Sequence, residues 1–356
     1  MNWWAKLRRN PLAQVGFVVL VILYLAVFVG DFLSPYAPDE QYRRQALLPP
    51  TPLHITDGKL VVYPSRKGPP DLNTGIPKYV EDQANPTEVQ FFVQGYPYRF
   101  MGAISSNLHL FGTKTTENSE KQGYLFLLGT DEQGRDQFSR LLSGGKISLT
   151  IGLIGIGISF PLGLLAGGVS GYFGGIVDNL MMRLTEVLMS VPSLYLFIAL
   201  AAVLSPQLTS AQRFTLITVI ISLTSWAGLA RVIRGQVLSL KEQEYVEASR
   251  AMGGSSMHIL FRHILPQTAT YIIISATLAI PSFIIAESVL SLIGLGIQEP
   301  DASWGNMLVG ANSTAKILFN SWLVVAPASL IIITSLAFNF LGDGLRDALD
   351  PRNTQR

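Results

Sequence analysis

The feature that most limits how this chain can fold is an uncharged run of 23 residues, 147–169. A helix needs roughly 20 mostly apolar residues to cross a bilayer, and this run meets that length. Five other stretches are apolar over a similar length, with Glu287 as the only charge deep inside one of them. The sequence therefore predicts an all-α, polytopic membrane protein with six transmembrane helices at about residues 11–30, 147–169, 187–204, 214–230, 269–296 and 321–341.

Composition supports this prediction and excludes several other classes. Charged residues make up 14% of the chain, against about 25% in soluble domains. The chain has no cysteine, which excludes a disulfide scaffold and thiolate chemistry, and a net charge of +2 does not indicate a nucleic-acid surface. Disorder and an ordinary cytosolic enzyme are excluded by the same figures.

The distribution of Lys and Arg predicts the orientation of the spans. If the N-terminus is cytoplasmic, the inner segments carry 12 basic residues, and the two short outer loops carry only Arg213 and Lys316. Six spans then return the C-terminus to the cytoplasm. The first span has a basic start like a signal peptide, but its apolar run is too long and lacks a small-x-small cleavage pattern, so we expect an uncleaved anchor.

This topology divides the chain into five parts. Residues 1–30 are the cytoplasmic N-terminus with the first helix, 31–128 an extracytoplasmic insertion, 129–146 a short interfacial helix, 147–341 the transmembrane core, and 342–356 a cytoplasmic tail. The insertion is turn-rich, with β-like runs at 59–63 and 89–93, and fits either a structural cap or a platform for a soluble partner. Thr130 and Gln133 have capping-box spacing for the interfacial helix.

The inner segment 235–266 carries charged and apolar residues at helical spacing. Gly253 and Gly254 can end a first short helix, because glycine takes the left-handed conformation without penalty. Ser255 or Ser256 can cap a second helix, and Pro266 leads into the fifth span. The apolar side of this hairpin either packs on the protein's own helices or docks into a partner's groove. Its members are Val237, Leu240, Tyr245, Val246, Ala248, Ala251 and Met252.

Part of this segment resembles the EAA loop of ABC-importer permeases. It reads EASRAMG at residues 247–253 and ILP at 264–266, with Ser249 where the family pattern has a second alanine. Four further motifs are similar to those of the "C"-type permeases for dipeptides, oligopeptides and nickel. They are GTDEQGRDQFSR at 129–140, GYFGG at 171–175, SWGNML at 303–308 and NFLGDGLRDALDPR at 339–352. The insertion 31–128 is longer than in the simplest family members.

The resemblance implies a permease subunit, not an enzyme, in the inner membrane of a bacterium. It implies a homologous second permease, two cytoplasmic ATPases that hold the ATP and Mg²⁺, and an extracytoplasmic binding protein, with no cofactor on this chain. The loop would couple to an ATPase through Glu247, Ala248, Ser249, Gly253, Leu265 and Pro266. Peptide is the implied cargo. Nickel or another peptide-like compound remains open.

Two other signals bear on function. Glu287 could line a translocation path, or accept hydrogen bonds from serines such as Ser282, Ser288 or Ser291 as buried structure. A stand-alone secondary transporter using Glu287 as its ion site is the alternative, although one acidic residue and no evident repeat argue against it. The run LSGGK at 142–146 resembles an ATPase signature, but no phosphate-binding loop accompanies it. The four histidines show no metal-ligand spacing, so no metal site is predicted.

Overall fold

The computed structural model of the chain describes residues 3–70, 77–100, 104–113, 122–203, 205, 207–309 and 319–349. They form two compact units. The first comprises Met1–Leu20, Thr150–Leu290 and Thr334–Arg356, and the second comprises Val21–Leu149 and Ser291–Ile333.

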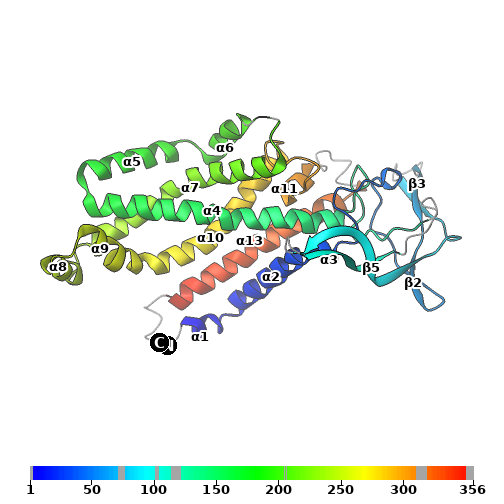
Figure 1. Cartoon of the computed structure of the whole chain (residues 1–356), viewed down its shortest axis with the longest axis horizontal. Coiled ribbons are helices and arrows are strands. Elements are labelled where there is room, and N and C mark those ends of the chain that lie inside the picture. The colour runs from blue at the N-terminus through cyan, green and yellow to red at the C-terminus, as the bar shows by residue number, and fades with distance from the viewer. Residues whose placement is uncertain are drawn as a thin grey trace. The chain divides into compact units, whose positions relative to one another are not determined.

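Within the described residues, five helical stretches are long and apolar enough to span a membrane. They are α2 (Pro11–Phe28), α4 (Gln137–Phe173), α7 (Ser210–Leu240), Ser256–Leu292, which contains α10 (Ala269–Leu292), and α13 (Trp322–Leu349). All five overlap spans expected from the sequence (Figure 1). Four of them run further than predicted at one end or both, and among these α13 takes in residues 342–349 of the expected tail.

The predicted third span, 187–204, is not one straight helix. The structure has α5 (Gly175–Ser190) and α6 (Ser193–Ala202), which are bent by 88° at a short break. Pro192 lies in the break, where it lacks an N–H for the helix and holds Val191 in an extended conformation. A count of six spans therefore requires that this bent pair be one span. Pro161 and Pro281 lie inside uninterrupted helices, α4 and α10.

A row of glycines brings α4 into backbone contact with α7. A Cβ atom added to Gly167 would lie 2.3 Å from the carbonyl oxygen of Ala230, and one added to Gly171 would lie 2.9 Å from that of Arg234. Gly163 faces Leu229 at a similar distance. The pattern Gly163-x-x-x-Gly167 therefore forms a packing surface for α7.

One ion pair attaches α5 to α7. Arg234 on α7 donates two hydrogen bonds to the carboxylate of Asp178 on α5, at 2.5 and 2.6 Å. Ser170 on α4 donates a third to the same carboxylate. The two-pronged geometry is the strong form of an arginine–carboxylate contact, so it fixes how α5 lies along α7.

The insertion is richer in strands than expected, and the prediction of an all-α chain is wrong there. An antiparallel sheet has the order β1-β2-β5-β6, and β3 pairs with β4 in a second, two-stranded sheet. The strands are β1 (His54–Thr56), β2 (Lys59–Val62), β3 (Ser65–Pro70), β4 (Pro77–Glu81), β5 (Thr87–Phe100) and β6 (Ile104–Thr113). The β-like runs at 59–63 and 89–93 mark β2 and β5. Two small cores, around Tyr36 and around Val62, hold this part together.

The expected separate helix in 129–146 is also wrong. Helix α4 begins at Gln137 and continues without a break into the second span. Its cap is Asp136, whose carboxylate accepts hydrogen bonds from the N–H and hydroxyl of Ser139. The hydroxyl of Thr130 instead accepts from the N–H of Leu48 and donates to the carbonyl of Gln45. Thr130 therefore does not cap a helix, although its spacing from Gln133 fits a capping box; its hydroxyl binds the loop that contains Gln45 and Leu48.

The remaining helical elements are short. They are α1 (Trp3–Leu7), α3 (Gly30–Leu33), a 3-10 turn (Arg43–Gln45), α8 (Glu244–Ala251), α9 (Ser256–Ile259), a π-helical turn (Leu260–Ile264), a 3-10 turn (Leu265–Thr268) and α11 (Trp304–Met307).

Candidate functional site

The segment after α7 forms a small helical hairpin, residues 244–265, which we term the coupling hairpin. Helix α8 ends at Ala251, and Gly253, two residues later, has a φ of +84° in the left-handed region. The hydroxyl of Ser255 accepts a hydrogen bond from the N–H of His258 and so caps α9. Both features were predicted from the sequence. The turn itself is closed by a hydrogen bond from the N–H of Gly254 to the carbonyl of Ser249.

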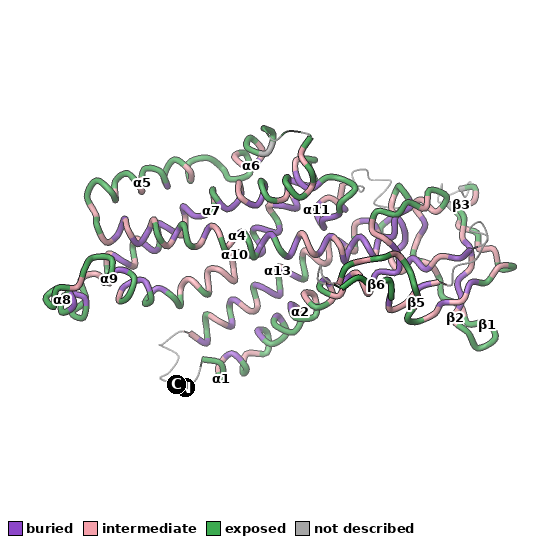
Figure 2. Tube along the Cα trace, viewed as in Figure 1, coloured by how far each residue is buried: buried purple, intermediate pink, exposed green. Residues whose placement is uncertain are grey.

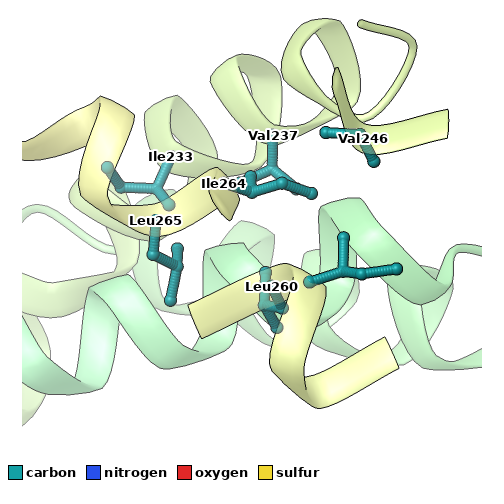
Figure 3. Packing of buried hydrophobic residues seen from close by; sticks show 7 residues of the cluster. Ile233, Val237, Val246, Leu260, Ile264 and Leu265 are labelled. Atoms are coloured by element: carbon teal, nitrogen blue, oxygen red, sulfur yellow. The ribbon is translucent and has the colours of Figure 1, made fainter. Parts of the chain in front are cut away.

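An apolar core holds the hairpin to the end of α7 (Figure 3). Val246 of α8 packs with Val237 of α7, and Leu260 and Ile264 close the cluster from the segment that follows α9. All four side chains are completely buried. The position of α8 is therefore set by side chains from two segments on either side of it in the chain.

The other face of α8 is open. Glu247, Ala248 and Gly253 are exposed, and so is Pro266. Ser249 and Leu265 are buried and belong to the internal packing. The structure therefore divides the six residues carried over from the family pattern into an accessible set and a supporting set.

The structure divides the residues that the sequence assigned to the apolar side of this hairpin. On α8 and its turn Val246 is buried, whereas Tyr245, Ala248, Ala251 and Met252 are exposed, Met252 to 83%. A helix of eight residues turns only about twice, so it buries a narrow stripe and leaves its flanking apolar residues outside. With Met257 and Phe261, also exposed, they give the hairpin a surface that is both apolar and charged.

A cluster of four charged side chains lies in the other unit. This arginine cluster consists of Asp131, Arg135, Arg140 and Glu299. Arg135 donates to Asp131 at 2.7 Å and to Glu299 at 2.5 Å. Arg140 lies 3.5 Å from Asp131 and 3.8 Å from Glu299, and it also donates to the carbonyl of Pro300 at 3.2 Å. Both arginine side chains are nearly inaccessible, at 4% and 3%, whereas Glu299 is half exposed.

Arg135 and Glu299 support each other's ionised forms. Burial by itself would lower the pKa of Arg135, but the hydrogen bond to Glu299 and the charge of Asp131 outweigh it and raise that pKa. Burial would raise the pKa of Glu299, but its contacts with Arg135 and Gln133 lower it. The sequence analysis missed Glu299, because 164 positions separate it from Arg135 and no local spacing connects them.

The arginine cluster lines a pocket of about 320 Å³. Its other walls come from the loop after α10, including Gln298, and from Asn306 and Met307. A shallower polar groove, lined by Arg43 and Glu132 among others, shares Arg135 and Glu299 with it. The pocket therefore has two buried arginine side chains and the half-exposed carboxylate of Glu299 in its wall.

The SWGNML motif packs next to this pocket against the part of α4 that contains the LSGGK run. Trp304 of SWGNML is completely buried, and its ring nitrogen donates a hydrogen bond to the carbonyl of Leu141. The ring lies over Gly145, where an added Cβ atom would be 3.2 Å from it. Its backbone N–H donates to the hydroxyl of Ser148. The LSGGK run is therefore a helical surface for Trp304, with no loop for a nucleotide.

Glu287 lies on α10 and is completely buried. Its neighbour in sequence, Ser288, is buried as well. Within the described residues, no group of three or more histidine, aspartate or glutamate side chains is placed to hold a metal ion.

Spanning helices, a capped loop hairpin at the end of α7 and an ion-paired pocket define a multi-pass membrane transport subunit. The sequence profile described as "Binding-protein-dependent transport system inner membrane component" matches residues 159–355, and that described as "N-terminal TM domain of oligopeptide transport permease C" matches residues 2–50. The chain belongs to this family of ABC-importer permeases, which reside in the bacterial inner membrane.

Named relatives agree with the assignment. The chain is 34% identical over 351 residues to the "Dipeptide transport system permease protein DppC" of Bacillus subtilis, covering 98% of this chain and 84% of the relative. It is 43% identical over 232 residues to the "Oligopeptide transport system permease protein OppC" of Haemophilus influenzae, covering 65% and 72%. The protein of the same description from Escherichia coli K12 is 44% identical over 234 residues, covering 65% and 74%.

Proposed function

We propose that this permease carries dipeptides or oligopeptides into the cell. The proposal rests on the relatives above, whose descriptions name these cargoes, and on the length over which the dipeptide permease aligns. Membership in the ABC-importer family argues against the stand-alone transporter built around Glu287. Nickel chelates and other peptide-like compounds are the alternative cargoes within the family resemblance.

We infer that the coupling hairpin docks into a cleft of a cytoplasmic ATPase. The observation that carries this is the division of the hairpin into a buried stripe and an open face. Val246 and Ser249 hold α8 in place, and Glu247, Ala248 and Gly253 are left accessible. A rigid-body movement of the ATPase would then act on α7 and on the segment leading to α10, since the core of the hairpin joins both.

The proposed assembly has this chain paired with a homologous second permease, two ATPases that bind ATP and Mg²⁺, and an extracytoplasmic binding protein. In this arrangement the chain crosses the membrane six times, with α5 and α6 as one broken span. Both termini are cytoplasmic and the insertion is outside. The excess of Lys and Arg in the inner segments supports this orientation.

The coupling proposal is tested with Glu247→Arg and Gly253→Pro. Proline cannot take the φ of +84° at position 253, and Glu247→Arg reverses a charge on the open face. Both variants should reach the membrane and abolish uptake of a labelled dipeptide. The control is Glu242→Arg, an equally exposed charge reversal just before α8, which should transport normally.

Two outcomes would change the proposed docking role or the proposed cargo. Normal uptake by both variants would discard the docking role of α8. Uptake of a nickel chelate but not of any dipeptide by the wild-type complex would keep the coupling and replace the cargo.

A further inference from the structure

The hairpin formed by β5 and β6 returns to the end of the first spanning helix. Phe100, at the end of β5, contacts Phe28, the last residue of α2, with ring centres 6.0 Å apart. Phe92 contacts Phe32 of α3 at 6.4 Å. An 18-residue helix is about 27 Å long, close to the thickness of the hydrocarbon layer, so Phe28 marks the level of the membrane edge.

A buried histidine fixes the hairpin at that level. Nδ1 of His109 on β6 lies 2.9 Å from the carbonyl oxygen of Asp31 in α3, and Nε2 lies 3.0 Å from that of Tyr96 in β5. Gly95 leaves the room for this ring, because a Cβ atom there would lie 2.7 Å from it. Lys146 of α4 in turn binds the carboxylate of Asp31 at 2.6 Å. The hairpin is thus attached to two spanning helices through α3.

The part of the hairpin beside α2 is apolar and open. Phe92 and Ile104 are each more than 60% exposed, and Ile104 is the register partner of Phe100. In Figure 2 exposed residues alternate with intermediate and buried ones along β5 and β6. On α2, Ile22, Leu25 and Phe28 are exposed as well, so the apolar surface is continuous from the helix to the hairpin.

The charges of the insertion are kept away from this edge. Between Phe91 and Thr113 the sequence has no acidic residue and only two basic ones, the buried His109 and the exposed Arg99. At the opposite edge of the same sheet, β1 and β2 carry His54, Asp57 and Lys59 within six positions. A surface of aromatic and aliphatic side chains with a flanking cation suits the boundary between acyl chains and phosphates.

We propose that the β5–β6 hairpin rests in the membrane interface, with Phe92, Phe100 and Ile104 among the outer acyl chains beside α2 and Arg99 against lipid phosphate. The insertion is then a membrane-supported structure, held at a fixed height over the lipid around the first helix. This follows from the position of the hairpin relative to α2 and does not depend on the cargo or on the ATPases.

The absence of cysteine makes the test direct, because one introduced cysteine is the only labelling site on this chain. Ile104→Cys and Phe92→Cys are each spin-labelled in the full complex, reconstituted in phosphatidylethanolamine–phosphatidylglycerol vesicles. The matched control is Ile55→Cys, at the opposite edge of the sheet, where isoleucine is 78% exposed against 64% at position 104. A sample with the unsubstituted chain subtracts label on the partner subunits.

Labels at 104 and 92 should relax more with oxygen, which concentrates in lipid, than with a water-soluble nickel chelate. The label at 55 should show the reverse order. A preference for the nickel chelate at 104 and 92 would place the hairpin in water and overturn the proposal. Low accessibility to both reagents would show that a protein, such as the second permease, covers this edge, and would overturn it as well.

Discussion

The coupling hairpin and the arginine cluster are both small loop structures at helix ends, but different interactions hold them. Apolar packing holds the coupling hairpin, and ion pairs hold the arginine cluster. Apolar side chains from neighbouring segments of the chain bury Val246 and leave the charges of α8 facing outward. In the arginine cluster the two arginine side chains are buried, Glu299 is half exposed, and Arg135 joins two loops that lie far apart in sequence. Apolar packing holds a shape and leaves the charged face free for a partner, whereas an ion-paired network depends on every one of its members.

The largest effect should come from the apolar side of this comparison. Leu260→Ala removes a completely buried side chain from the core of the coupling hairpin and should destabilise it by about 3–4 kcal/mol. Met257→Ala, three residues earlier and half exposed, is the control and should have little effect. Thermal unfolding of the purified complex, with protease sensitivity of residues 241–265, measures both. Equal losses in the two variants would mean that the core does not support the hairpin.

Removing one member of the arginine cluster should have the next largest effect. Arg135→Ala leaves Asp131 and Glu299 without their main partner and should cost about 2 kcal/mol, less than for a fully buried pair because Glu299 is half exposed. Arg135→Lys keeps the charge but loses the planar fork, so its midpoint of thermal unfolding should fall between those of wild type and Arg135→Ala. If lysine proves as damaging as alanine, geometry matters there and charge does not.

The smallest expected effect concerns pH and the cap of α4. Burial raises the pKa of Asp136 to about 6, although hydrogen bonds from Ser139 oppose the shift. Between about pH 4 and pH 6 the folded protein therefore holds a proton that the unfolded chain has released, and the stability from this group falls as pH rises through that window. Asp136→Asn keeps a capping oxygen without the charge. Its stability relative to wild type should grow from pH 4 to pH 6 and then level off, as followed by thermal unfolding; a constant difference would refute the assignment.

The same contrast explains how far sequence predicts this fold. Spans follow from runs of apolar residues, and the turn at Gly253 and the cap at Ser255 follow from local chemistry, so these were predictable. The break at Pro192 does not follow from local sequence, because the same residue type at Pro161 leaves a helix intact and only the surroundings decide. Glu299 could not be found, since its partner is distant in sequence. The strands of the insertion were only partly visible, because β5 alternates weakly between buried and exposed residues.

The glycine row on α4 limits how this chain can change over time. At Gly163, Gly167 and Gly171 the facing atoms of α7 occupy the space that the smallest side chain would need. Every amino-acid replacement at a glycine codon adds at least one carbon atom, so no conservative substitution exists at these three positions. A library of random variants selected for growth on the transported nutrient should therefore retain glycine there, while Gly157, which faces nothing within 4 Å on the same helix, accepts replacement freely.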